Sequence, residues 1–154
     1  MKRMKILIDA DGCPVVYLTV SVAKEYGVEA VIFCDTSHEF RIDGVKTVTV
    51  DKGADSADFK IVNSMNGGDL VVTQDYGLAA MVLSKSGKAV TQNGLEITPF
   101  NIDSLLASRY AAKKARMSKK HLKGPPKRTE EQDTAFERTF RRILDTLSQN
   151  GKEE

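Results

Sequence analysis

Acidic residues follow short apolar segments at two distant places in the chain. Asp9 and Asp11 come directly after the apolar run 6–8. Asp75 comes shortly after the apolar run 70–72. In an open parallel sheet, ligands bind beyond the carboxyl ends of the strands, where such residues would meet. Because Mg²⁺ and Mn²⁺ prefer oxygen ligands, this pattern predicts a divalent-cation site at that edge.

A second pair of acids lies between these two segments. Asp55 and Asp58 stand three residues apart at an expected helix start, the spacing of an N-cap and the third helical residue. Acids there stabilise a helix through its dipole, so one of the pair is expected to do only that. The candidate catalytic residues are therefore Asp9, Asp11, Asp55, Asp58 and Asp75, and the candidate metal ligands are the same residues without Asp55.

The other acids have structural alternatives as well, since Asp is a common N-cap at strand-to-helix junctions. If Asp9 and Asp11 both stay in extended backbone, they point to the same face. Two like charges held close together need a cation or hydrogen bonds to offset their repulsion. Ser56 and Thr73 are candidate donors to a phosphate or a metal-bound water, although each also suits a cap or a turn.

Cys13 stands at an expected helix start, a position that lowers the pKa of a thiol and favours a nucleophile. However, no motif places His38 or His121 beside it as a base. We therefore expect Cys13 to be a small packed residue. Because Cys13 and Cys34 form no zinc-type spacing, both are expected to be free thiols.

Apolar periodicity predicts an alternation of strands and helices. The expected strands are 4–9, 28–34, 46–50, 69–74, 88–91 and 95–98, and the expected helices are 14–26, 55–65, 76–86, 101–117 and 129–149. This order favours an α/β fold with a mostly parallel, Rossmann-like sheet flanked by helices. Pro14 suits the first turn of its helix, and Gly27 suits the end. The hairpin signal 92–94 indicates an antiparallel strand at one edge.

The composition fits one soluble globular domain. The chain has 154 residues, of which 41% are hydrophobic and 29% are charged. No apolar run approaches the roughly 18–20 residues that span a bilayer. The basic start of the chain resembles a signal peptide, but the apolar stretch after it stops at Asp9. We therefore expect a cytoplasmic protein that does not bind membranes.

Positive charge is concentrated late in the chain. Residues 104–129 hold nine Lys or Arg residues and no Asp or Glu, although the whole chain has a net charge of +2. Such a run is often only a solvated surface. Its length without an acid instead predicts a nucleic-acid partner, whose phosphates it would neutralise. The candidate substrate-binding residues are Lys119, Lys120, His121, Lys123, Lys127 and Arg128, together with Ser56 and Thr73.

The last part of the chain is expected to be a basic arm followed by an amphipathic helix. The sequence 124–126, Gly-Pro-Pro, breaks any helix, and Thr129 and Gln132 form a capping-box signal. An apolar stripe then predicts burial in the core or in a homodimer interface, and it consists of Phe136, Phe140, Ile143, Leu144 and Leu147. We therefore divide the chain into an α/β domain, 1–117, and an arm with a helix that packs on it, 118–154.

Four blocks of this chain, 9–15, 51–58, 73–79 and 119–129, together resemble the YaiI/YqxD family of uncharacterised bacterial proteins. The first block reads Asp-Ala-Asp-Gly-Cys-Pro-Val, with Gly12 where the family usually has Ala. That family is similar to PIN-like domains, which implies an acidic, metal-binding nuclease centre at the carboxyl edge of the sheet. The resemblance implies that Asp9 matches the first-strand acid. It likewise implies that Asp55 or Asp58 matches the central helical acid, and Asp75 the acid after the later strand.

These patterns and the resemblance predict metal-assisted hydrolysis of phosphodiester bonds, with RNA as the preferred substrate. An alternative is a non-catalytic RNA- or ribosome-binding module in which the acids are structural. A second alternative is a phosphatase, because 9–12 also resembles the first motif of haloacid-dehalogenase-type phosphatases. In those enzymes Thr or Val normally stands where this chain has Cys13, and a pair of acids follows the late strand where here only Asp75 does.

Overall fold

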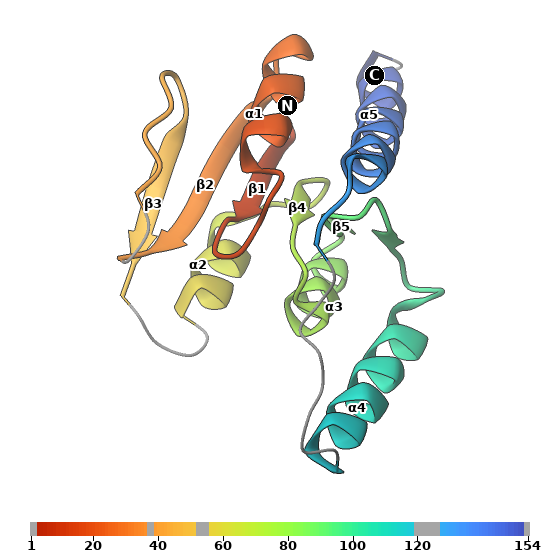
Figure 1. The fold of residues 1–154 in the computed structure, drawn as a ribbon. Helices are drawn as coiled ribbons and strands as arrows, with labels where there is room; N and C mark the ends of the chain where they lie inside the picture. Colours follow the sequence, from red (N-terminus) through yellow and green to blue (C-terminus); the bar gives the residue numbers. More distant parts are fainter. Residues whose placement is uncertain (1–2, 37–38, 52–55, 119–126, 153–154) are drawn as a thin grey trace.

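The described residues form a single six-stranded sheet. The computed structural model describes residues 3–36, 39–51, 56–118 and 127–152, with only the backbone for 56, 116–118 and 149–152. The strands are β1 (Lys5–Asp9), β2 (Glu29–Asp35), β3 (Lys46–Val50), β4 (Leu70–Val72), β5 (Lys88–Val90) and β6 (Glu96–Ile97). They lie in the order β3-β2-β1-β4-β5-β6, and all pairs are parallel except β5–β6. The expected mostly parallel sheet with an antiparallel edge is confirmed (Figure 1).

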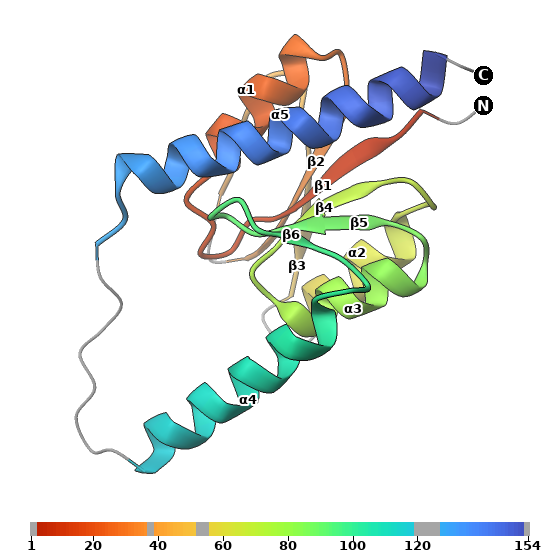
Figure 2. The same ribbon diagram turned by 90° about the vertical axis from the view of Figure 1, so that its right-hand side faces the viewer.

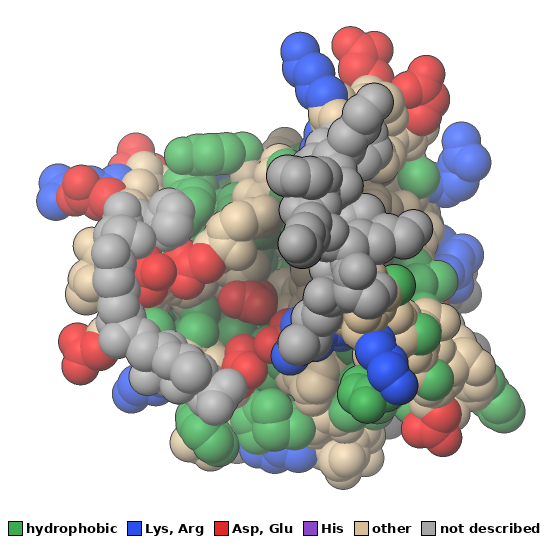
Figure 3. Space-filling view, turned by 60° about the horizontal axis from the view of Figure 1, so that its bottom comes forward, with side chains coloured by type: hydrophobic (Ala, Val, Ile, Leu, Met, Phe, Trp, Pro, Cys, Tyr) green, Lys and Arg blue, Asp and Glu red, His purple; other side chains and the backbone are tan. Residues whose placement is uncertain are grey.

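Helices cover both faces of this sheet. They are α1 (Val16–Glu25), α2 (Ser56–Ser64), α3 (Tyr76–Ser84), α4 (Ile102–Ser118) and α5 (Glu130–Lys152). Alternate strand residues point to opposite faces. Ile6 and Ile8 of β1 therefore belong to a core with α1 and α5, while Leu7 belongs to a core with α2 and α3 (Figure 2). The carboxyl ends of the parallel strands meet at one edge, which Figure 3 views from outside.

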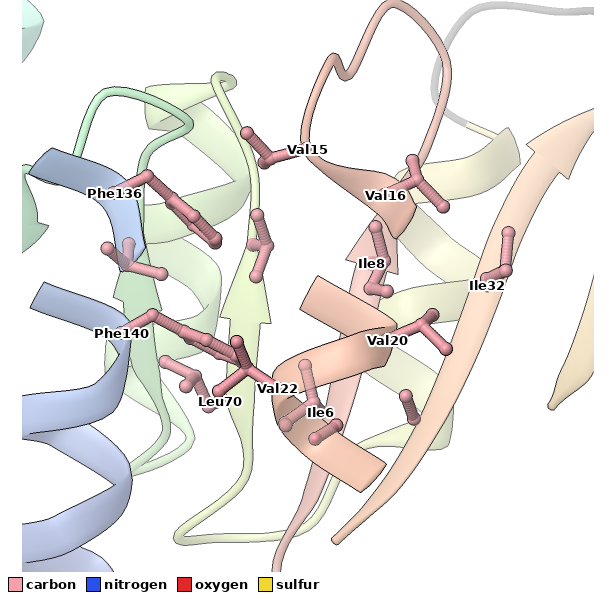
Figure 4. Close-up of a cluster of buried hydrophobic side chains, with 14 of the residues drawn as sticks. Ile6, Ile8, Val15, Val16, Val20, Val22, Ile32, Leu70, Phe136 and Phe140 are labelled. Carbon is pink, nitrogen blue, oxygen red and sulfur yellow. The ribbon is translucent and has the colours of Figure 1, made fainter. Parts of the chain in front are cut away.

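Helix α5 belongs to the core. Phe136 and Phe140 are fully buried, and their rings stack with centroids 5.2 Å apart. Figure 4 shows the Phe140 ring pointing from α5 toward Val22 of α1 and Leu70 of β4. The whole stripe lies in or against this core, so it serves the fold of the chain itself. The predicted capping box is confirmed, since Thr129 and Gln132 exchange hydrogen bonds between side chain and backbone.

The turn after β1 delays the start of the first helix. Helix α1 begins at Val16, two residues later than expected, because Cys13 N donates to Ala10 O across a tight turn. Gly12 has a φ of 72° in that turn, a conformation that favours glycine. The N-cap position is Val15, so the N-cap alternative for Asp11 is wrong. Strand β4 is also shorter than expected, because the chain turns at residues 73–75 to enter α3.

The two central strands are clamped together at their amino ends. Asp69, which is buried just before β4, accepts hydrogen bonds from the backbone N and from Nζ of Lys5, both at 3.0 Å. Asn66 N donates to the same carboxylate at 2.8 Å. The carboxylate is therefore both neutralised and fully hydrogen-bonded.

In the described parts of the chain, no helix is long and apolar enough to cross a membrane.

The hairpin turn between β5 and β6 touches α5 at Gly94. A Cβ placed on Gly94 would lie 2.5 Å from Ala135 O, and the residue has a φ of 85°. We therefore expect Gly94→Ala to lower the free energy of unfolding by about 3 kcal/mol, from left-handed strain and displacement of α5. Gly44→Ala, at a similar φ with open space around it, should cost only about 1 kcal/mol. Urea denaturation measures both values, and equal losses would contradict the close approach.

Candidate active site

A small pocket opens at the carboxyl ends of β1 and β4. Its cavity of about 60 Å³ holds an ion with a few waters but not a nucleotide. It is lined by Asp9, Asp11, Gly12, Cys13, Val72, Thr73, Gln74 and Gln92. Figure 3 shows acidic side chains gathered across the middle of this edge, with a Lys or Arg side chain beside them. The sheet thus brings together residues that are distant in sequence, as expected.

Asp9 enters the pocket from the last position of β1. Ile8 pairs with Val72, so the next residues, Asp9 and Thr73, stand side by side on the two strands. Thr73 Oγ1 donates to Asp9 Oδ2 at 2.8 Å. The same hydroxyl accepts from Asp75 N at 3.0 Å. Thr73 therefore fixes the orientation of the Asp9 carboxylate and the path of the chain into α3.

The environment of Asp9 disfavours its charge. Burial raises the pKa of Asp9 above its ordinary value, and the charges of Asp75 and Asp11 raise the pKa further, against the opposing effect of the Thr73 hydrogen bond. Within the described residues no Lys or Arg forms an ion pair with Asp9. Asp69, on the same pair of strands, is neutralised by Lys5. The Asp9 carboxylate is thus a recessed anionic group that a bound cation would stabilise.

Asp11 lines the pocket but leaves the strand. Its two carboxylate oxygens accept from Asp35 N, at 3.2 and 3.0 Å, so Asp11 caps the end of β2. Asp9 and Asp11 do not share extended backbone, the condition under which they would point to the same face, because β1 ends at Asp9 and the chain turns at Gly12. Asp11 is still close enough for its charge to act on Asp9.

Asp75 stands beside the pocket and has two structural contacts. It is the N-cap of α3, with Oδ1 accepting from Leu78 N at 3.1 Å. Arg109 of α4 lies 3.4 Å from the same oxygen. The N-cap interpretation is therefore confirmed, and its charge also acts on Asp9. A pattern of local sequence could not reveal the contact with Arg109, which joins segments 34 residues apart.

The remaining candidates are placed less closely. Asp58 is half-buried in the first turn of α2 and is not among the pocket-lining residues. Lys127 is exposed ahead of α5. The predictions that lie outside the described residues are those for Asp55, Lys119, Lys120, His121, Lys123 and the side chain of Ser56.

Arg128 makes several contacts within the chain. Its guanidinium donates to Asp133 Oδ1 at 2.7 Å, to Asn93 Oδ1 at 2.6 Å and to the Gln92 carbonyl at 2.6 Å. These bonds tie the start of α5 to the β5–β6 hairpin. To bind substrate as predicted, Arg128 would have to use guanidinium N–H groups that are not engaged in these contacts.

Two polar residues that line the pocket, Gln74 and Gln92, were not singled out from the sequence. Gln92 Oε1 is buried and, within the described residues, has no hydrogen-bond partner. Gln74 Oε1 accepts from Gln92 N at 3.0 Å, and this bond links the strand ends. The only signal in the sequence was the hairpin motif that contains Gln92. Burial raises the pKa of the Cys13 thiol, which argues against a thiolate nucleophile and agrees with a packed role.

The oxygen-rich lining fits a hard divalent cation. The carboxylates of Asp9 and Asp11 and the orphan oxygen of Gln92 border one cavity. Among the described residues, no three His, Cys, Asp or Glu side chains come close enough together to hold a metal ion. Mg²⁺ is commonly held by one or two carboxylates with waters and substrate phosphates, so two carboxylates meet that need.

Comparison with known proteins places this chain among uncharacterised relatives. A family model described as "Uncharacterized BCR, YaiI/YqxD family" matches residues 7–146. A UPF0178 protein of Exiguobacterium sibiricum is 50% identical, over 92% of this chain and 96% of its own length. One from Clostridium acetobutylicum is 46% identical over 92% and 97%. The crystal structure of a mutant of Rae1 (YacP) from Bacillus subtilis aligns with a TM-score of 0.44 and 15% identity, covering 94% of this chain and 99% of that one.

The energetic cost of the charge on Asp9 can be measured as a change in the free energy of unfolding. Asp9→Asn removes that charge and keeps an oxygen to accept from Thr73. We expect the free energy of unfolding at pH 7 to rise by about 1 kcal/mol, or about 2–4 °C in Tm. Asp69→Asn should instead cost about 3 kcal/mol, because it removes the buried carboxylate that neutralises the partly buried Lys5. Destabilisation by Asp9→Asn at pH 7 would contradict the unfavourable charge.

The stabilisation expected from Asp9→Asn should also depend on pH. Because the pKa of Asp9 is raised in the folded protein above 3.8, the folded protein takes up this proton before the unfolded chain does. The charge penalty is thus fully present above the raised pKa and absent below 3.8. Thermal melts across this range should show the advantage of Asp9→Asn shrinking as the pH falls. An advantage that is constant with pH would assign it to another cause.

Proposed function

Because this chain belongs to the YaiI/YqxD family, we propose that it is a cytoplasmic, divalent-metal-dependent nuclease that hydrolyses phosphodiester bonds, preferably of RNA. The observation that carries the proposal is the Asp9 carboxylate. It is recessed and lacks a cationic partner within the described residues, and its pKa is raised by burial and by two neighbouring acids. Such perturbed groups in clefts are typical of functional sites.

The contrast with Asp69 supports this interpretation. Both acids stand at ends of the β1–β4 pair, where the chain could supply a partner for either one. Asp69 accepts three hydrogen bonds, one of them from Lys5 Nζ, whereas Asp9 accepts one within the described residues, from the Thr73 hydroxyl. We expect an acid with a purely structural role to have a cationic partner and several hydrogen bonds, as Asp69 does. Binding of Mg²⁺ or Mn²⁺ would offset the desolvation and repulsion that Asp9 otherwise bears.

In this proposal, the residues of the pocket have separate roles. A divalent ion would supply a hydroxide nucleophile and neutralise charge on the phosphate. Asp9 and Asp11 would hold that ion, and Thr73 would keep Asp9 oriented. Gln92 Oε1 would accept a hydrogen bond from a water in the pocket. On the resemblance to PIN-like domains, Asp75 and either Asp55 or Asp58 would be the further acids of this centre.

The preference for RNA rests on the resemblance to PIN-like domains and on charge. The basic stretch 104–129 follows a mildly acidic sheet region, so a polyanion could be held beside the acidic pocket. Lys119, Lys120, Lys123, Lys127, Arg128 and His121 remain the proposed contacts to the substrate backbone, with Ser56 and Thr73 near the phosphate.

A non-catalytic RNA-binding module is the second candidate, and two observations favour it. Asp11 and Asp75 both have structural contacts, and no group of three metal-binding side chains occurs among the described residues. In that case the acids would stabilise the strand ends and the basic stretch alone would bind RNA. The two candidates differ in what Asp9→Asn does to cleavage.

The deciding experiment measures cleavage of labelled single-stranded RNA with Mn²⁺. We expect the wild type to cleave and Asp9→Asn to be at least about 100-fold slower. Asp43→Asn is the matched control, because Asp43 lies in the exposed turn before β3, at the opposite edge of the sheet. It should cleave as the wild type does, and EDTA should stop both proteins.

Metal binding is read separately by thermal melting. Mn²⁺ should raise the Tm of the wild type and of Asp43→Asn but not that of Asp9→Asn, since a ligand stabilises only the state that binds it. Equal cleavage by Asp9→Asn would contradict the proposed role of Asp9 and assign the activity to another source, such as a contaminating nuclease. RNA binding without cleavage, equal in all three proteins, would favour the binding module.

A further inference from the structure

Helix α4 leaves the body of the protein after its first turns. Ile102 and Leu105, in its first turns, pack against the core beneath α3. Every residue from 107 to 115 is exposed. Figure 2 shows the second half of α4 extending away from the sheet. A helix exposed on all sides gains little stability from packing, which points to a binding role for its surface.

The face of α4 that packs on the body becomes basic where the helix projects. Ile102, Leu105, Arg109 and Lys113 are spaced by three, four and four residues, so they lie on one side of the helix. The inward stripe thus changes from apolar to positively charged along the same face. Arg109, the first charged residue of this face, contacts Asp75 beside the acidic pocket.

One contact ties this stripe to the candidate site. Arg109 Nη1 lies 3.4 Å from Asp75 Oδ1, and the charge of Asp75 acts on Asp9. Arg109 is half-exposed in this pair, so it can also meet a ligand. The stripe therefore begins at the rim of the acidic pocket and continues outward along α4.

From this geometry we propose that the projecting half of α4 binds the backbone and a base of single-stranded RNA next to the acidic pocket. The proposal rests on the proposed function, since it names the substrate of that site. Arg109 and Lys113 bind successive phosphates, being about 6 Å apart along the helix axis at 1.5 Å per residue. Lys114 adds a third positive charge on the flank.

The charge of this segment is not compensated along the helix. Residues 104–118 contain no Asp or Glu, so the basic side chains have no acidic neighbour one turn away. A strand of phosphates would neutralise them and release counterions, which makes binding strongly salt-dependent. An acidic partner protein would present negative charges at a lower density than a strand of phosphates.

Tyr110 favours a single strand over a duplex. Its side chain is 69% exposed and stands between Arg109 and the flanking Lys114 around the helix. An exposed aromatic ring beside basic residues is the arrangement on which unpaired bases stack. Bases inside a duplex cannot reach such a ring, whereas phosphates of a duplex would use the lysines alone.

The test is equilibrium binding of a fluorescein-labelled 12-nucleotide single-stranded RNA, followed by anisotropy in EDTA at several salt concentrations. We expect Lys113→Ala/Lys114→Ala to weaken binding and to reduce the slope of log K against log salt by about 1.4. The matched control is Arg3→Ala/Lys46→Ala, which removes two exposed charges from the opposite edge of the sheet. It should bind and respond to salt as the wild type does.

Stacking is tested separately at Tyr110. Tyr110→Ala should weaken binding of the single strand about fivefold or more, while Tyr110→Phe, which keeps a ring, should retain it. Circular dichroism checks that each variant keeps its helix content. A blunt RNA duplex of the same length should bind more weakly and should not respond to Tyr110→Ala.

The inference is overturned if the lysine pair and the control pair behave alike, if the wild type does not bind, or if the duplex binds as tightly as the single strand. EDTA excludes cleavage from this assay, so these outcomes do not depend on the nuclease. Binding through α4 by a protein that never cleaves would leave this inference intact and overturn the proposed function instead.

Discussion

The parallel pairing of β1 with β4 is the constraint on which the site depends. The chain turns from β1 to α1 on one face and from β4 to α3 on the other, so a crevice opens between these strand ends. The register that pairs Ile8 with Val72 sets Asp9 beside Thr73 at this crevice. At the opposite end of the same strands, Asp69 and Lys5 fix that register. The position of Asp9 therefore follows from the pairing of the strands.

The same geometry explains why the site is electrostatically unfavourable in the absence of a ligand. The strand ends leave little room, so Asp9 loses water without gaining a cation within the described residues. Asp11 and Asp75 reduce the cost of their own charges by capping β2 and α3, but their negative charge still acts on Asp9. Proteins retain such local strain chiefly at functional sites, where ligands relieve it. This uncompensated charge distinguishes Asp9 from an ordinary acid at the end of a strand.

Local sequence patterns predicted the elements well, because periodicity and capping act within a few residues. The strand 46–50 appears as expected, and Asp75 caps its helix. The geometry of the site was harder to predict, because it depends on contacts between distant segments. Gly12 turned Asp11 toward β2, and Gln92 entered the pocket only through the hairpin register. The strand order alone could not place these side chains.

The basic stretch 104–129 shows why net charge is an incomplete guide to binding. Arg109 faces the acidic rim, whereas Arg128 holds the start of α5 against the hairpin. Arg128, just before α5, donates to the carbonyl of Gln92, and Gln92 N donates to Gln74. These bonds connect the start of α5 to two residues that line the pocket. The last helix thus positions part of the site from outside it. A chain without that helix would lose both the support of Gln92 and the buried contacts of Phe136 and Phe140 with the core that includes β1 and β4.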